Sequence, residues 1–325
     1  MSPNRVLLAG MAGMAGVTLA AVLPLMTMVA MGPRTSAAAS SEQSAAPAEE
    51  FSGQVDVGGG RKLYLHCKGS GSPVVLLESG IHDSSDTWTI TDTKPPVPSK
   101  PSVFDGVAAF TRVCAYDRPG TVRYGQTPSI TRRSTPIGRT RSLSEMSDDV
   151  DRMLEAAGVP GPYVLTGHSF GGMIQRLYAQ RHPDNVAGLV FVDAFDVSVE
   201  PLMGGHWPAY VKLLNAPGTT SDDDEDFEKV DVEGALAAVR QAPPLPRVPA
   251  AVLSKSQPFA VAPTAPEDVL KRLEASWPKV QDALVDLEPQ TPHTIATGSD
   301  HYIQINDPDL TTSMIRLVHG RADRD

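Results

Sequence analysis

The chain has 325 residues, of which 41% are hydrophobic and 6% are aromatic, and this composition is sufficient for one sizeable hydrophobic core. Its formal net charge is -10 at pH 7, and its lysines and arginines are scattered along the sequence. Because nucleic acids and anionic membrane surfaces attract basic proteins, this charge balance argues against both classes of partner.

The N-terminal region differs in composition from the rest of the chain. Arg5 precedes an uncharged, largely apolar stretch from Val6 to Pro33, and small residues follow at 36–40. This arrangement is typical of an export signal over residues 1–39, and the Ala-, Ser-, Glu- and Pro-rich residues 40–50 then read as a disordered linker. The apolar stretch is also long enough to cross a bilayer, so an uncleaved anchor is the alternative. We therefore expect a secreted or envelope-associated protein, with no membrane contact except through such an anchor.

Between residues 51 and 320, short apolar runs alternate with helical patterns. Residues 51–67 alternate around a Gly58-Gly59-Gly60 turn, which predicts a hairpin. Further apolar runs predict buried strands at 73–77, 112–116, 163–166, 186–192, 248–253 and 291–297. Helical periodicity follows Ser142, Ser169 and Pro308 and covers 266–287. The order predicts an α/β fold with a mostly parallel sheet between helices, and the Pro- and acid-rich segment 197–245 reads as an inserted cap.

The segment Gly167-His168-Ser169-Phe170-Gly171 joins a predicted buried strand to a predicted amphipathic helix. A G-x-S-x-G sequence in this context is typical of a nucleophile elbow, a sharp turn that exposes the serine hydroxyl above the sheet. A plain glycine-rich connection between strand and helix is the alternative. Chemistry in open α/β sheets collects at the carboxyl ends of strands, where Ser169, Asp193 and His301 are all predicted to lie.

Three segments resemble the α/β-hydrolase superfamily, in its esterase, lipase and peptidase branch. They are this elbow, Tyr116-Asp117-Arg118-Pro119-Gly120 and Asp300-His301-Tyr302-Ile303-Gln304. The resemblance covers about 51–320 and implies an eight-stranded α/β-hydrolase sheet and the chain order nucleophile, acid, histidine. It makes Ser169 the nucleophile. It makes His301 the base, because His301 follows the last strand at a Gly-Ser turn, where the family carries its base.

The acid is the point at which the sequence departs from the family's commonest pattern. No carboxylate follows the strand at 248–253, where the family most often places its acid. Some members place it after the strand that follows the elbow helix, and Asp193 stands there. A carboxylate has only to meet the far nitrogen of the histidine and hold its tautomer, which Asp193 can do. Glu267 or Asp268 would require a long loop to fold back, and an Asp at position 193 is also a common structural residue in the family.

The resemblance also assigns groups around the reacting carbonyl. The backbone amides of Ile81 and Phe170 are expected to form the oxyanion hole. His82 and Trp88 are expected to line the substrate pocket. Arg118, with its neighbour Asp117, is expected to form an ion pair that braces a turn rather than to act chemically.

The two cysteines, Cys67 and Cys114, fall on strands that lie side by side and antiparallel if the strand order follows the family. They would then face each other, and export would permit a disulfide between them. Two reduced, buried cysteines are the alternative.

These observations predict an exported serine hydrolase that acts on a small-molecule or lipid-like substrate. A carboxylic ester is the expected bond, and an amide, lactone or thioester is the alternative. No zinc spacing, G-x-G-x-x-G or phosphate loop occurs, so we expect no cofactor and no metal. The acidic run 222–226 could bind calcium but lacks the glycine-turned spacing of a calcium loop. The alternatives are a lyase or a cofactor-free oxidative enzyme on the same fold, or a non-catalytic envelope-binding protein.

Overall fold

The structure is a computed structural model, which describes residues 50–91, 100–125, 127–218, 221–260 and 265–322. These residues fall within one structural unit, 45–325. The expected export signal or anchor at 1–39 and nearly all of the expected linker at 40–50 lie outside the described residues.

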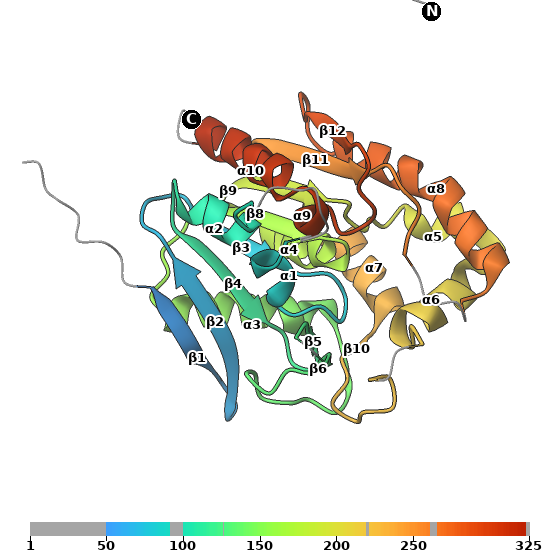
Figure 1. The fold of residues 1–325 in the computed structure, drawn as a ribbon, viewed down its shortest axis with the longest axis horizontal. Helices are drawn as coiled ribbons and strands as arrows, with labels where there is room; N and C mark the ends of the chain where they lie inside the picture. The colour runs from blue at the N-terminus through green and yellow to red at the C-terminus, as the bar shows by residue number, and fades with distance from the viewer. Residues whose placement is uncertain (1–49, 92–99, 126, 219–220, 261–264, 323–325) are drawn as a thin grey trace, which may run out of the picture. The chain divides into compact units, whose positions relative to one another are not determined.

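A sheet of eight strands forms the centre of this unit (Figure 1). In spatial order the strands are β1 (Phe51–Gly58), β2 (Arg61–Lys68), β4 (Val113–Asp117), β3 (Val74–Glu78), β8 (Tyr163–His168), β9 (Val186–Val192), β11 (Ala250–Lys255) and β12 (His293–Ala296). β1 pairs with β2 and β2 with β4 in antiparallel fashion, whereas all pairs from β4 to β12 are parallel. The expected opening hairpin and mostly parallel sheet are therefore confirmed.

Side chains alternate between the two faces of the sheet, because successive residues of a strand point in opposite directions. In β3, Leu76 enters one buried cluster while Val75 and Leu77 enter the other. The first cluster takes residues from α3 (Leu143–Ala156), α4 (Phe170–Arg181), α7 (Val232–Gln241) and α8 (Glu267–Val285). The second takes residues from α1 (Asp86–Thr89), α2 (Val103–Ala108), α9 (Ile303–Asn306) and α10 (Pro308–Ala322). Helices thus cover both faces (Figure 1).

The start of α3 shows how a local sequence signal fixes an element. The Ser142 hydroxyl accepts a hydrogen bond from the Glu145 amide at 3.2 Å, and the Glu145 carboxylate accepts one from the Ser142 amide at 3.0 Å. This capping box satisfies amides that have no partner inside the helix, and such a cap contributes about 1 kcal/mol.

The connections contain short strands that the sequence does not predict, and the helices that its weak helical patches in 197–245 indicate. Residues 121–141, expected as a loop, carry β5 (Val122–Arg123), β6 (Ser129–Ile130) and β7 (Thr140–Arg141). The segment 197–245, expected as a cap, carries α5 (Val199–Met203), α6 (Trp207–Asn215), β10 (Lys229–Val230) and α7. β10 pairs in parallel with β7, which ties this segment to the loop. Strands of two residues are too short to show a hydrophobic period.

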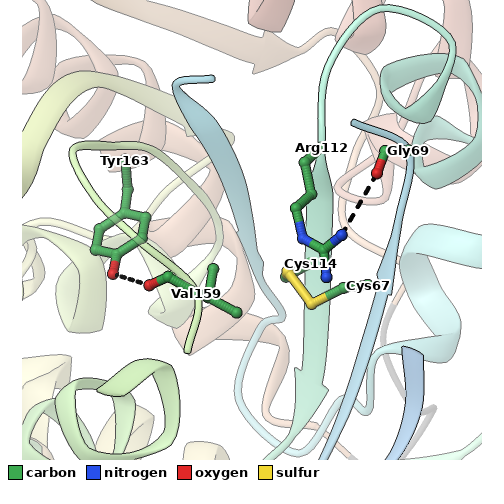
Figure 2. The surroundings of a disulfide bond; sticks show 6 residues. All are labelled: Cys67, Gly69, Arg112, Cys114, Val159 and Tyr163. Atoms are coloured by element: carbon green, nitrogen blue, oxygen red, sulfur yellow. Dashed lines mark hydrogen bonds between the residues drawn. A yellow bond between two sulfur atoms is a disulfide. The ribbon is translucent and has the colours of Figure 1, made fainter. Parts of the chain in front are cut away.

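Cys67 and Cys114 stand directly opposite each other in the pairing of β2 with β4. They form a disulfide, and Figure 2 shows it lying between the two strands. Next to it, the Arg112 side chain donates a hydrogen bond to the Gly69 carbonyl oxygen at 3.5 Å. A cross-link that closes a loop of this kind stabilises a fold by about 2–4 kcal/mol.

Candidate active site

Ser169 lies between β8 and α4 with φ 51° and ψ -126°, a backbone conformation that a residue with a side chain rarely adopts. Glycines make this turn possible because they let backbone segments approach closely. A Cβ on Gly171 would lie 2.5 Å from the Ser79 carbonyl oxygen, and a Cβ on Gly167 would lie 2.6 Å from the Gly172 Cα. The expected elbow geometry is present, with Ser169 at its apex.

The structure places Asp193 against His301. The two side chains meet with 2.6 Å between His301 Nδ1 and Asp193 Oδ2. The other carboxylate oxygen of Asp193 accepts a hydrogen bond from the Lys255 amide at 3.0 Å, and the Asp193 amide donates to the Leu253 carbonyl oxygen at 2.7 Å. Because Nδ1 faces a carboxylate it carries the proton, which leaves Nε2 of His301 free to act as a base.

Glu267 and Asp268, the alternative acids, lie at the start of α8 and have other partners. Glu267 pairs with Lys271 at 2.6 Å, and Asp268 lies 3.5 Å from the imidazole of His206. Both carboxylates are largely exposed. The carboxylate that contacts His301 is therefore that of Asp193.

A cavity of about 420 Å³ contains both Ser169 and His301 in its wall. The segment 197–245 contributes Tyr210, Leu213, Leu214, Pro217, Ser221 and Phe227, and the region that includes α8 contributes Phe259, Ala260, Leu270 and Leu273. Most of these side chains are apolar. The segment expected as a cap thus supplies much of the wall around the candidate nucleophile.

The two residues expected in the pocket wall behave differently. His82 lines the cavity, donates through Nε2 to the Leu214 carbonyl oxygen at 2.6 Å, and stacks on the Phe227 ring at 4.3 Å between centroids. Trp88 is fully buried in the cluster that contains Val75 and Leu77. The expectation for Trp88 is therefore wrong, because the short helix α1 turns its ring into the core beneath the sheet rim.

His168 makes a contact that the sequence does not predict. Its Nε2 donates to the backbone oxygen of His301 at 2.9 Å, and the two rings lie 4.6 Å apart between centroids. Burial lowers the pKa of His168 and keeps its ring neutral. The residue before the nucleophile therefore holds the loop that carries the candidate base.

The turn that follows β3 contains Ile81 and is held by distant side chains. Arg118 donates to the carbonyl oxygens of Ser79 at 2.9 Å and Gly80 at 2.6 Å. Glu228 accepts a hydrogen bond from the His82 amide at 2.6 Å. The backbone is thus fixed on both sides of Ile81, whose amide is the expected oxyanion donor.

Arg118 does not pair with Asp117, contrary to expectation. Its guanidinium contacts Glu78 at 2.6 Å and Glu228 at 2.7 Å, whereas Asp117 pairs with Arg133 at 2.7 Å. Asp117 is the last residue of β4 and Arg118 lies in the turn that follows, so the two side chains reach different partners. Glu228 was not found by sequence reasoning, because no local motif marks an acid whose partner lies far away along the chain.

The buried acids around Arg118 differ in their protonation behaviour. Burial raises the pKa of Glu78 to about 7, although the Arg118 charge and a hydrogen bond from the Tyr116 hydroxyl oppose this shift. Burial also acts to raise the pKa of Glu228, but the charge and hydrogen bond of Arg118, together with contacts from His82, lower that pKa overall. Glu228 is therefore the firmly ionised partner of Arg118.

The acidic run and the helices bear on two possible partners, a metal ion and a membrane. In the acidic run at 222–226, Asp224 and Asp226 pair with Arg132, and the described residues contain no cluster of His, Cys, Asp or Glu suited to a metal ion. Within the same described part of the chain, every helix is too short or too polar to cross a bilayer.

A family model described as the alpha/beta hydrolase fold matches residues 73–307. The chain belongs to the alpha/beta hydrolase family. A Schizosaccharomyces pombe protein without an assigned function, C23C11.06c, is 33% identical over 153 residues, 42% of this chain and 26% of its own length. The mouse sn-1-specific diacylglycerol lipase ABHD11 is 37% identical over 82 residues, 25% of this chain and 26% of its own length. The chain thus matches about a quarter of each of these relatives.

Among solved structures, a thermophilic esterase from Thermogutta terrifontis has the same fold. Its TM-score is 0.52 at 19% sequence identity, and the match covers 84% of this chain and all of that one. The members of this hydrolase family share a sheet rim that can carry several chemistries. The residues at this rim therefore determine which reaction a given member carries out.

Proposed function

We propose that this protein is an exported serine hydrolase that cleaves carboxylic esters through an acyl-enzyme intermediate. The contact of 2.6 Å between His301 Nδ1 and Asp193 Oδ2, beside a cavity that Ser169 also lines, is the observation that carries the proposal. A serine hydroxyl becomes a useful nucleophile only when a base accepts its proton during the attack.

In the proposed reaction, Ser169 Oγ attacks the ester carbonyl carbon while His301 Nε2 takes the hydroxyl proton. The amides of Ile81 and Phe170 donate to the oxyanion that forms, and Asp193 stabilises the imidazolium. Collapse of the intermediate breaks the bond to the alcohol, which leaves with the proton from His301. Water then attacks the acyl-enzyme with the same base, releases the acid and restores Ser169.

The cavity supports an ester with an apolar part as the substrate. Its wall carries Leu213, Leu214, Phe227, Leu270 and Leu273, which favour hydrocarbon over a strongly polar chain. The mouse relative, which matches a quarter of this chain, is named a lipase that acts on a diacylglycerol. A small ester or lipid-like molecule fits both observations.

Two features support export. The N-terminal residues have the composition of an export signal. The disulfide between Cys67 and Cys114 fits an oxidising compartment, since reducing compartments keep such thiols reduced.

A fluorophosphonate probe tests the proposal. It should label the wild-type protein at Ser169, and Ser169→Ala should abolish both the labelling and the hydrolysis of p-nitrophenyl esters. A panel of graded acyl chain length would then define the preferred acid. Labelling without ester turnover would favour a lyase or oxidative activity, and no labelling at all would indicate a binding protein.

A further inference from the structure

Asp83 brings a second carboxylate to the cavity, separate from that of Asp193. The residue is buried, with 4% of its surface exposed, and it lines the same cavity as Ser169 and His301. A Cβ placed on Gly80 would lie 3.0 Å from Asp83 Oδ2 and 3.2 Å from Ser169 Cβ. The Asp83 carboxylate and the candidate nucleophile therefore border the same small space.

Within the described chain, no lysine or arginine forms an ion pair with Asp83. Its Oδ1 accepts a hydrogen bond from the Tyr124 hydroxyl, and Oδ2 lies 3.9 Å from Nδ1 of His168, which burial keeps neutral. The guanidinium of Arg118 is engaged by Glu78, Glu228 and backbone carbonyls. A buried carboxylate without a counter-charge costs free energy that a cationic ligand would recover.

The charge at Asp83 is present at neutral pH. Burial raises the pKa of Asp83 to about 6, and hydrogen bonding from Tyr124 limits the shift. The negative charge of Asp83 in turn raises the pKa of Tyr302, another residue of the cavity wall. The Tyr124 hydroxyl and the more distant charge of Arg118 both favour the ionised form of Asp83, although no lysine or arginine among the described residues forms an ion pair with it.

Two unpaired ring nitrogens, on His168 and His82, are also acceptors. His168 uses Nε2 as a donor to the His301 carbonyl, so its Nδ1 carries a lone pair and has no hydrogen-bond partner among the described residues. His82 likewise donates through Nε2 to Leu214, and its buried Nδ1 has no partner there either. Of these two histidines only His82 belongs to the cavity wall, so a ligand that complements Asp83 and His82 has to bring hydrogen-bond donors.

We infer that Asp83 forms a subsite for a protonated amine, and that the preferred ester carries such an amine close to its reacting carbonyl. The inference rests on the proposed hydrolase function of the same site. The apolar wall that includes Leu213, Phe227 and Leu273 accommodates the rest of the molecule. Beside a neutral substrate the buried carboxylate of Asp83 would be left without a counter-charge, and this penalty provides the discrimination.

Matched pairs of esters test the inference with the purified protein. One pair compares the p-nitrophenyl ester of an ω-amino acid with that of the alkanoic acid that has a methyl group in place of the ammonium. A second pair compares a dimethylaminoethyl ester with the isopentyl ester of the same acid. The first pair places the amine in the acyl group and the second in the alcohol. For each pair, the ratio of kcat/KM for the cationic ester to that for the neutral ester is measured.

The wild-type protein should prefer the cationic member of at least one pair, and Asp83→Asn should reduce that preference by roughly 10- to 100-fold. Asp83→Glu, which keeps the charge, should retain part of it. Asp224→Asn removes an equal charge from a surface ion pair with Arg132 and should leave the ratio unchanged.

The outcomes separate the two proposals. Fluorophosphonate labelling and turnover of the neutral esters report on the hydrolase function and on folding of each variant. A wild-type protein that is labelled but shows no preference in either pair overturns the amine subsite and leaves the hydrolase intact. Equal preference in the wild type and in a labelled Asp83→Asn variant also overturns the subsite. Absence of labelling in the wild type overturns the hydrolase itself.

Discussion

The two sides of the cavity are built by different means. On the nucleophile side, backbone contacts set the positions: the Ser169 amide donates to the Val192 carbonyl at 3.1 Å, and the Lys255 amide donates to Asp193 at 3.0 Å. On the oxyanion side, buried ion pairs of Arg118 and Glu228 hold the turn around Ile81. Backbone geometry tolerates most side-chain changes, whereas a buried ion pair fails when either partner is lost. We therefore expect the oxyanion side to be the more fragile to substitutions away from the reacting groups.

Replacement of the candidate acid, Asp193, is expected to have the largest effect on catalysis. Asp193→Asn should lower kcat for a short ester by about 10³- to 10⁴-fold, because the amide no longer holds the productive tautomer of His301. Glu267→Gln is the control, since Glu267 is exposed and pairs with Lys271. Steady-state kinetics of both variants decide the assignment. Loss of activity only in Glu267→Gln would show that the acid has been misassigned.

Arg118→Met should produce the next largest effect. It leaves Glu78 and Glu228 buried without their cation, and breaking a buried pair costs about 3–5 kcal/mol of stability. Release of the turn around Ile81 should also lower kcat by about 10²-fold while KM changes less, since an oxyanion donor acts in the transition state. Urea unfolding and kinetics measure the two effects. An increase in KM with kcat unchanged would mean that Arg118 supports substrate binding instead.

Glu228→Gln should have a smaller effect. The amide oxygen can still accept the hydrogen bond from the His82 amide, but the charge that faces Arg118 is lost. We expect kcat to fall by about tenfold, which corresponds to about 1.4 kcal/mol. Asp226→Asn is the matched control on the same segment. Its pair with Arg132 is partly exposed, and such pairs contribute about 0–1 kcal/mol. Equal kinetics for the two variants would contradict a role of Glu228 in the turn.

Glu78→Gln should change the pH dependence of stability. The folded pKa of Glu78 is raised from 4.5 to about 7, so the folded protein binds this proton more tightly than the unfolded chain does. Its contribution to stability therefore falls as the pH rises through that interval. The wild type should lose stability relative to Glu78→Gln between pH 5 and pH 8, as measured by denaturant unfolding at both values. A constant difference would show that Glu78 stays ionised throughout.

The two sides also differ in how far their sequence predicts them. The elbow at Ser169, the strand end at Asp193 and the turn before His301 carry local signals, because glycines and buried runs fix the backbone there. The sequence does not predict the position of the Trp88 ring, because a helix of four residues turns the ring into the core and is too short to show a hydrophobic period. The roles inferred for Glu228 and Asp83 depend on contacts with residues that lie far away along the chain. A single sequence records such side-chain contacts only weakly, because they depend on how the segments pack.

Glu228 belongs to the segment 197–245, yet it secures a turn that belongs to the sheet. Any movement that lifts this segment from the rim withdraws the acceptor of the His82 amide and one counter-charge of Arg118. In the proposed mechanism, the turn that carries the Ile81 amide would then be held in place only while this segment lies against the rim. Ester cleavage by that mechanism would therefore require the segment to cover the cavity.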